Sequence, residues 1–125
     1  MAEHQLIDTS AWIEYFRRDG DPETRERVAE SVRSQRAALC DMVFLELMRG
    51  NRHQREKARL VAETLPHLAT DGNCWRKAAD FAIRASEAGK PVPNTDLLIF
   101  ACGKAHRAEI IHRDRHFDTL EELAD

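Results

Sequence analysis

The chain has 125 residues, 42% hydrophobic and 33% charged, values that fit one soluble domain covering residues 1–125. Its longest apolar run, residues 97–102, is far shorter than the roughly 20 residues of a membrane span. The N-terminus lacks the basic and apolar regions of a secretion signal, so we expect a cytoplasmic protein. The net charge of −3 argues weakly against a nucleic-acid-binding protein, but two bound divalent cations would reverse its sign.

Three cysteines, Cys40, Cys74 and Cys102, cannot all pair within one chain, and none belongs to a Cys-x-x-Cys pattern. We expect reduced thiols, with Cys40 and Cys102 on apolar faces. Nothing in their spacing favours a redox or metal-binding role.

The first half of the chain alternates short apolar runs with helix-start signals. Residues 4–7 lean apolar and lead into Asp8, where Asp-Thr-Ser is typical of a helix start. Gly20 and the residues after it separate an aromatic helix from a mostly charged one. Residues 37–40 predict a second strand, followed by another helix. Its spacing leaves two apolar faces open: Met42, Leu45 and Met48, or Val43 and Leu47.

In the second half, residues 51–64 favour a polar helix and residues 66–70 a short strand. Residues 71–88 predict a helix that Gly89 ends. A strongly apolar helix then begins at Asn94 or Thr95, and residues 108–112 form the last clear strand before a short C-terminal helix. The side chains expected to face inward from the helix over residues 71–88 are Trp75, Ala78, Ala79, Ala82 and Ile83.

Strands that alternate with helices predict an α/β fold with a parallel sheet covered on both faces. In such sheets, ligands bind outside the carboxyl ends of the strands. Asp8 follows the first strand, Asp114 follows the last, and Asp96 starts the apolar helix. Glu46 interrupts an apolar helical stretch. Because strand ends and helix starts share one edge of the sheet, these four carboxylates can converge.

Each acidic residue also has a structural interpretation. Asp8 and Asp96 could cap helices, and Asp114 could be a turn residue. Glu46 is harder to explain in this way, because an unpaired carboxylate in apolar surroundings is costly. If the four do converge, they repel one another, and Mg²⁺ or Mn²⁺ is suited to resolve this. Such ions activate water for phosphodiester hydrolysis, and no His/Cys cluster with zinc spacing competes with this hypothesis.

Four segments resemble the successive motifs of VapC-type PIN domains: Asp8-Thr-Ser-Ala-Trp-Ile-Glu-Tyr-Phe, Leu45-Glu-Leu-Met-Arg-Gly, Val92-Pro-Asn-Thr-Asp-Leu-Leu-Ile and His112-Arg-Asp-Arg-His-Phe-Asp. The resemblance spans residues 6–118. It implies a PIN-like three-layer fold with four or five parallel strands, and an Mg²⁺- or Mn²⁺-dependent endoribonuclease toxin that cleaves tRNA or ribosomal RNA. It also implies inhibition by a VapB-like antitoxin, which often inserts an Arg into the acidic pocket, and assembly into homodimers and toxin–antitoxin complexes.

The resemblance assigns roles to the four carboxylates. Asp8 and Asp96 are expected to bind metal directly, and Glu46 and Asp114 to bind through water or to orient a second ion. Hydroxyl groups expected to hydrogen-bond these carboxylates belong to Thr9, Ser10 and Thr95.

The sequence departs from the family pattern at two points. Many relatives carry Asp at the position of His116, so the role of that acidic residue is in doubt here, and Asp118 is a candidate to replace it. Relatives also often have a final edge strand that this chain does not show.

The roles expected for the remaining histidine, aromatic and basic side chains follow from their neighbours in the sequence. His112 and His116 are interpreted as local hydrogen-bonding residues rather than metal ligands. Trp12 and Phe16 favour the core, and any exposed remainder of their face would suit an antitoxin helix. Basic residues close to the acidic motifs, candidates for contact with RNA or the antitoxin, are Arg49, Arg113 and Arg115.

Three alternatives remain open to different degrees. A PIN-like nuclease could process RNA or cut DNA flaps without an antitoxin, and a catalytically silent binding domain could retain the fold. A receiver-type signalling domain is disfavoured, because it needs adjacent acidic residues after the first strand and a Lys after the last. Here Leu6 and Ile7 precede Asp8, and no Lys follows Ala108.

Overall fold

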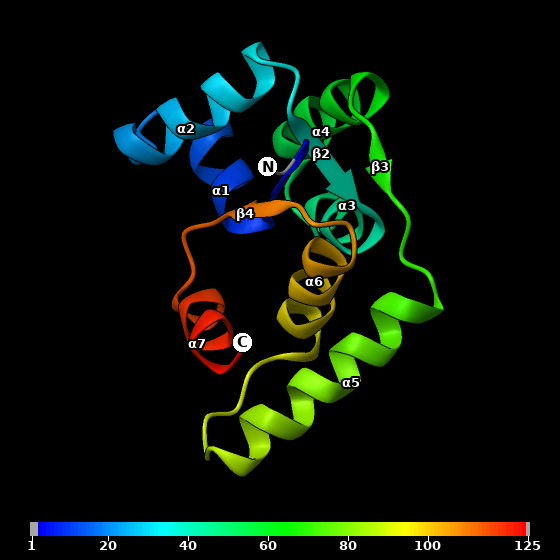
Figure 1. Ribbon diagram of the computed structural model, residues 1–125. Coiled ribbons are helices and arrows are strands. Elements are labelled where there is room, and N and C mark those ends of the chain that lie inside the picture. The colour runs from blue at the N-terminus through cyan, green and yellow to red at the C-terminus, as the bar shows by residue number, and fades with distance from the viewer. Residues whose placement is uncertain (1–2, 125) are drawn as a thin grey trace.

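Four short parallel strands form the centre of the molecule (Figure 1), which the computed structural model describes over residues 3–124. Their order in the sheet is β3-β2-β1-β4. Leu6 of β1 pairs with Ala38 of β2 on one side and Ile110 of β4 on the other. The strands are β1 (Gln5–Ile7), β2 (Ala37–Cys40), β3 (His67–Leu68) and β4 (Glu109–Ile111).

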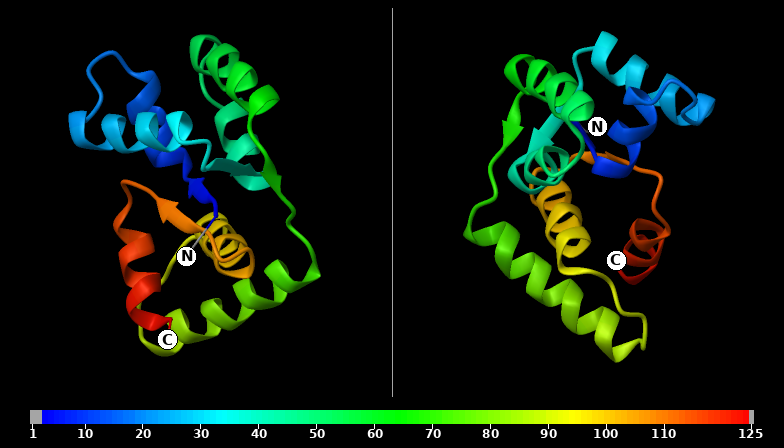
Figure 2. Two further views of the ribbon diagram at one scale, coloured as in Figure 1. Left: turned by 45° about the horizontal axis from the view of Figure 1, so that its top comes forward. Right: turned by 180° about the vertical axis from the view of Figure 1, so that it is seen from behind.

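Helices surround this sheet in two groups. In Figures 1 and 2, α1 and α2 lie together near α3 and α4, whereas α6 runs between α5 and α7 on the other side. The three-layer α/β architecture expected from the sequence is therefore confirmed. The helices are α1 (Thr9–Phe16), α2 (Pro22–Arg33), α3 (Asp41–Met48), α4 (Arg52–Thr64), α5 (Gly72–Glu87), α6 (Asn94–Ala105) and α7 (Arg115–Leu123).

Short polar side chains define where most helices begin. Asp8 caps α1 by accepting a hydrogen bond from the backbone N–H of Ser10, and Asp114 caps α7 in the same way from His116. Such caps satisfy backbone donors that have no partner within the helix. In this fold they also fix two acidic residues at the carboxyl ends of neighbouring strands.

The apolar core lies between the sheet and its helices, and α6 is its most buried element, with every residue from Asp96 to Gly103 buried. Gly103 allows the close approach of α6 to β4, since a Cβ there would lie 2.8 Å from the side chain of Ile110. The fold therefore places the N-terminal turn of α6 at the edge where β1 and β4 end.

The structure corrects the buried face predicted for α5 and decides between the two faces left open for α3. In α5 the buried face consists of Cys74, Ala78, Phe81 and Ala85, whereas Trp75 and Ile83 are 59% and 56% exposed. The inward face predicted for this helix was therefore wrong except at Ala78 and the half-buried Ala82. In α3 the second alternative holds: Val43 and Leu47 are buried, and Leu45 is 54% exposed.

The structure also decides the remaining predictions about strands, the aromatic pair and membrane spans. The strand predicted over residues 66–70 is only two residues long, and no fifth strand is seen in residues 3–124. Trp12 and Phe16 are buried, so this aromatic pair belongs to the core and offers no docking face. None of the described helices combines the length and apolar character that a membrane span needs.

Candidate active site

The four acidic residues singled out by sequence lie on four different helices or caps around one edge of the sheet. Asp8 and Asp114 are the caps that follow β1 and β4, Asp96 lies in the first turn of α6, and Glu46 lies on α3. Burial, together with the charges of Asp114, Asp8 and Glu46, raises the pKa of Asp96 to about 7. The four carboxylates therefore influence one another, as expected for a converging set.

Asp8 is 3% exposed, and its two oxygens are in different situations. Oδ2 accepts hydrogen bonds from the backbone N–H and the hydroxyl of Ser10. Oδ1 is buried without a hydrogen-bond partner. Burial raises the pKa of this carboxyl, and the Asp114 charge adds to the effect, although the Ser10 hydrogen bonds oppose it. A buried carboxylate oxygen without a partner is costly, so a cation at this position would relieve a real electrostatic cost.

Glu46 is held by the chain segment that follows Asp8. Its Oε1 accepts a hydrogen bond of 2.7 Å from the Thr9 hydroxyl, which joins α3 to the start of α1. Partial burial raises the pKa of Glu46, and the charges of Asp8 and Asp114 act in the same direction, whereas Arg49 lowers it. Thr9 therefore aims this carboxylate toward the other acidic residues.

The third part of the cluster contains His116. Its Nδ1 lies 3.1 Å from Oδ2 of Asp96 and 2.9 Å from Oδ1 of Asp114. Nδ1 is buried, and despite these short distances its alignment makes no hydrogen bond to either oxygen. The contacts of Nδ1 with Asp96 and Asp114 are therefore close electrostatic contacts. The sequence predicts a local hydrogen-bonding role for His116, and the structure instead places its ring nitrogen among the acidic side chains.

Ser10 links the segment after β1 to the segment after β4 at the site. Its hydroxyl donates to Asp8 and accepts a 2.9 Å hydrogen bond from the backbone N–H of Arg113. The Arg113 side chain turns toward Glu14 and Asp21, at 3.4 and 3.3 Å. The sequence predicts Ser10 only as a hydrogen-bond partner of the acidic cluster. Its second bond, across 103 residues, had no signal in the sequence.

The donor atoms present fit a hard divalent cation. One ligand atom each from Asp96, Asp114 and His116 lie within 4.8 Å of one another. Clustered carboxylates and an unpartnered oxygen favour Mg²⁺ or Mn²⁺, which bind oxygen ligands and retain water. Such a set of donors can hold a metal ion. The ion can in turn bind the phosphate group of a substrate.

Comparison with known proteins points to one family. The model of the PIN domain matches residues 6–123. Ribonuclease VapC11 of Mycobacterium tuberculosis is 35% identical, over 94% of this chain and 92% of its own length. The chain belongs to the VapC ribonucleases of the PIN-domain family. The family and enzyme class expected from the four motifs, a ribonuclease toxin of a toxin–antitoxin system, are thereby confirmed.

Solved structures agree with this fold. A toxin–antitoxin complex from Klebsiella pneumoniae superimposes with a TM-score of 0.71 at 20% identity, covering 89% of this chain and 87% of that one. VapC20 of Mycobacterium tuberculosis, described as a toxin that cleaves the sarcin–ricin loop, gives a TM-score of 0.67 at 17% identity, with 92% and 93% covered.

Two residues expected to support this VapC site do not hydrogen-bond its carboxylates in the described part of the chain. Asp118, the candidate replacement for the family's acidic residue, faces His112, with 3.7 Å between Oδ1 and Nε2, and its side chain is 73% exposed. Thr95, expected to bond a carboxylate, forms no such hydrogen bond within the described part of the chain. The polar support that the site does show comes from Thr9 and Ser10.

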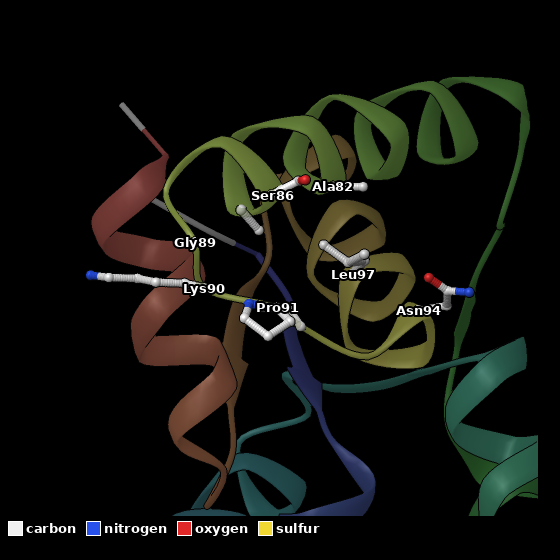
Figure 3. A pocket seen from close by; sticks show the side chains of 9 residues that line it. Ala82, Ser86, Gly89, Lys90, Pro91, Asn94 and Leu97 are labelled. Atoms are coloured by element: carbon white, nitrogen blue, oxygen red, sulfur yellow. The ribbon is translucent and has the colours of Figure 1, made fainter.

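A separate cavity of about 400 Å³ lies between the end of α5 and the start of α6 (Figure 3). Figure 3 shows Ala82 and Ser86 of α5 facing Leu97 of α6 across it, with Pro91 at its rim. None of the four carboxylates lines this cavity. The catalytic candidates thus lie at the edge of the sheet rather than in this pocket.

Proposed function

We propose that Asp8, Glu46, Asp96 and Asp114 hold one or two Mg²⁺ or Mn²⁺ ions and that this site hydrolyses phosphodiester bonds in tRNA or ribosomal RNA. The observation that carries the proposal is the unpartnered, buried Oδ1 of Asp8 in a cluster whose charges raise the pKa values of Asp8, Glu46 and Asp96. Without a cation this arrangement is electrostatically unfavourable, and a hard divalent ion removes the conflict.

When bound, a divalent ion in such a site lowers the pKa of water and stabilises negative charge on phosphate oxygens. The chain's own residues prepare the site for this chemistry. Asp8 and Asp96 are the proposed direct ligands, because they are the two buried carboxylates. Glu46, oriented by Thr9, and the half-buried Asp114 are placed to bind ordered water and to accept a proton from it.

His116 adds a nitrogen to this oxygen-rich set of donors. Imidazole suits transition metals, whereas Mg²⁺ is bound mainly by oxygen, so we expect Mn²⁺ to support activity at least as well as Mg²⁺. The ring also reduces the negative charge around Asp96, since the interaction with His116 lowers the pKa of that carboxyl.

RNA would be held by cationic side chains around the acidic edge. Arg49 and Arg115 are exposed and lie close in sequence to Glu46 and Asp114, respectively. Arg113 is held by Glu14 and Asp21, which fixes its guanidinium beside the loop that carries Asp114. These residues are the proposed phosphate contacts. The description of VapC20 as a sarcin–ricin loop nuclease supports ribosomal RNA as one substrate class.

A VapB-like antitoxin is the proposed protein partner, supported by the likeness to the toxin–antitoxin complex from Klebsiella pneumoniae. The buried Trp12–Phe16 face cannot receive it. Leu45 of α3 and Leu60 of α4 are 54% and 68% exposed on two helices that contact each other, and they are the proposed apolar contacts of the antitoxin. An antitoxin Arg would neutralise the carboxylates. Trp75 and Ile83 of α5 are the proposed surface for a homodimer.

Two measurements test this function. Expression of the chain alone should arrest growth of the host cell, and co-expression with an adjacent small reading frame that encodes the proposed antitoxin should restore it. Asp96→Asn should abolish the arrest, whereas Asp80→Asn, a matched change of an exposed Asp on α5, should not. Growth arrest that persists in Asp96→Asn would contradict the proposed site. If wild type neither arrests growth nor cleaves RNA, the alternative of a catalytically silent domain gains support.

A further inference from the structure

A second group of potential metal ligands lies outside the acidic site. Cys74 of α5 and Cys102 of α6 are fully buried, and His106, directly after α6, is half-buried. One donor atom from each of the three lies within 4.8 Å of the others. Two buried thiols and an imidazole thus converge at a point that the nuclease chemistry does not use.

The three side chains surround one backbone carbonyl. Nε2 of His106 lies 2.8 Å from the oxygen of Ala69, and Sγ of Cys74 and Sγ of Cys102 lie 3.4 and 3.9 Å from the same atom. Donors that meet around one oxygen define a small polar pocket inside an otherwise apolar region. A cation there would also meet the negative end of the carbonyl dipole.

Local structure fixes each of these donors. Cys102 and His106 are four residues apart and share one face of the α6 region. Cys74 lies in the first turn of α5, where its N–H is bonded to the cap residue Asp71. Because α5 packs along α6, the two sides of the pocket are held together before any ion binds.

We propose that Cys74, Cys102 and His106 bind a Zn²⁺ ion. Thiolate and imidazole are the preferred zinc ligands, whereas Mg²⁺ and Mn²⁺ prefer the oxygen donors of the nuclease site. Binding releases the two thiol protons to solvent and leaves a neutral imidazole as the third ligand. Water or the Ala69 carbonyl oxygen completes the coordination.

This site is separate from the nuclease site but shares a helix with it. Cys102 follows Asp96 by six residues, about 9 Å along the axis of α6 at the usual helical rise. A bound ion would connect the segment after β3 to both α5 and α6. Zinc is therefore a structural ligand here, and its binding should raise the melting temperature of the protein.

Cys40 provides a matched control. It interacts with Cys102, and that contact with the Cys40 thiol, followed by burial, raises the pKa of Cys102. Cys40 is nevertheless not one of the three converging donors. Cys40→Ser therefore changes the same buried region without removing a proposed ligand.

The test uses the whole reduced protein, freed of metal with a chelator and titrated with Co²⁺ and then Zn²⁺. We expect a thiolate-to-cobalt charge-transfer absorption at one equivalent and its loss on displacement by Zn²⁺. Because all three thiols are buried, their reaction with a thiol reagent is followed in mild denaturant, where Zn²⁺ should slow modification of two of the three. His106→Gln, a half-exposed position at which folding is expected to survive, should weaken Zn²⁺ binding at least tenfold, and Cys74→Ser should abolish the absorption.

Cys40→Ser and Asp96→Asn should keep the absorption and the affinity, because neither residue is a ligand in this pocket. The proposal is overturned if Co²⁺ gives no thiolate absorption, or if excess Zn²⁺ leaves all three thiols as reactive as in the metal-free protein in the same mild denaturant. It is also overturned if His106→Gln binds Zn²⁺ as wild type does. The nuclease proposal stands or falls separately, since RNA cleavage is not a readout of this experiment.

Discussion

Nδ1 of His116 lies 3.1 Å from Oδ2 of Asp96, at a position where many PIN domains carry an acidic residue. The same nitrogen is 2.9 Å from Asp114. The His116 imidazole thus stands where an acidic side chain would add a further negative charge, and its interaction with Asp96 is favourable. The departure from the family pattern therefore reduces the repulsion within the acidic site while keeping four carboxylates.

Replacing His116 by Asn should raise the pKa of Asp96 above about 7, because the interaction with His116 lowers it in the wild type. An NMR titration of the side-chain carboxyl carbon of Asp96 in metal-free protein measures this directly. His112→Asn is the matched control: His112 contacts Asp118 rather than Asp96 and should leave the titration unchanged. A pKa of Asp96 that falls in His116→Asn would disprove the electrostatic role given to this ring.

Asp96→Asn should reduce RNA cleavage at least a hundredfold, which corresponds to about 2.7 kcal/mol of transition-state stabilisation. The same variant, without metal, should be as stable as wild type or more stable at neutral pH, because it removes a buried charge from a repelling cluster. Chemical denaturation checks the stability. A purely structural helix-start role predicts the reverse: activity nearly retained and stability lowered by roughly 0.5–2 kcal/mol.

The raised pKa of Asp96 also sets a pH dependence of stability. Folded protein binds more protons than unfolded protein between the ordinary pKa of 3.8 and about 7. The contribution of Asp96 is therefore fully present below about pH 4 and is lost as pH rises through about 7. Metal-free wild type should lose stability across this window, and Asp96→Asn should lose less. Equal slopes of unfolding free energy against pH in the two proteins would contradict the assignment.

Thr9→Val should lower activity about 10- to 100-fold, because it removes the hydroxyl that orients Glu46. Thr9→Ser retains that hydroxyl and should keep most of the activity. Steady-state cleavage of one defined RNA by both variants separates orientation of Glu46 from a general effect on folding. If Val and Ser are equally impaired, the hydrogen bond to Glu46 is not what matters at this position.

The sequence was most informative where local chemistry and position coincide. Asp8 and Asp114 each follow a strand and cap a helix, so the topology of a parallel sheet was enough to bring them together. Asp96 was recognisable from its place at the start of an apolar helix. These features depend on short-range signals and on one general property of α/β folds.

Long-range packing explains what was missed. Helix α5 has apolar residues on two adjacent stripes, and only its contact with α6 selects Cys74, Ala78, Phe81 and Ala85 over the stripe with Trp75 and Ile83. The direction of the His116 ring likewise depends on where Asp96 lies, 20 residues earlier in the chain. Sequence spacing contains neither piece of information.

The most direct test of the central claim is RNA cleavage by purified, antitoxin-free protein after chelation and after return of metal. We predict no cleavage in excess EDTA, recovery with Mg²⁺ or Mn²⁺, and no recovery in Asp96→Asn at the same metal concentration. Because both ions would bind the carboxylates of the acidic site, recovery should saturate as the metal concentration is raised. Undiminished cleavage by the wild-type protein in excess EDTA would contradict the account.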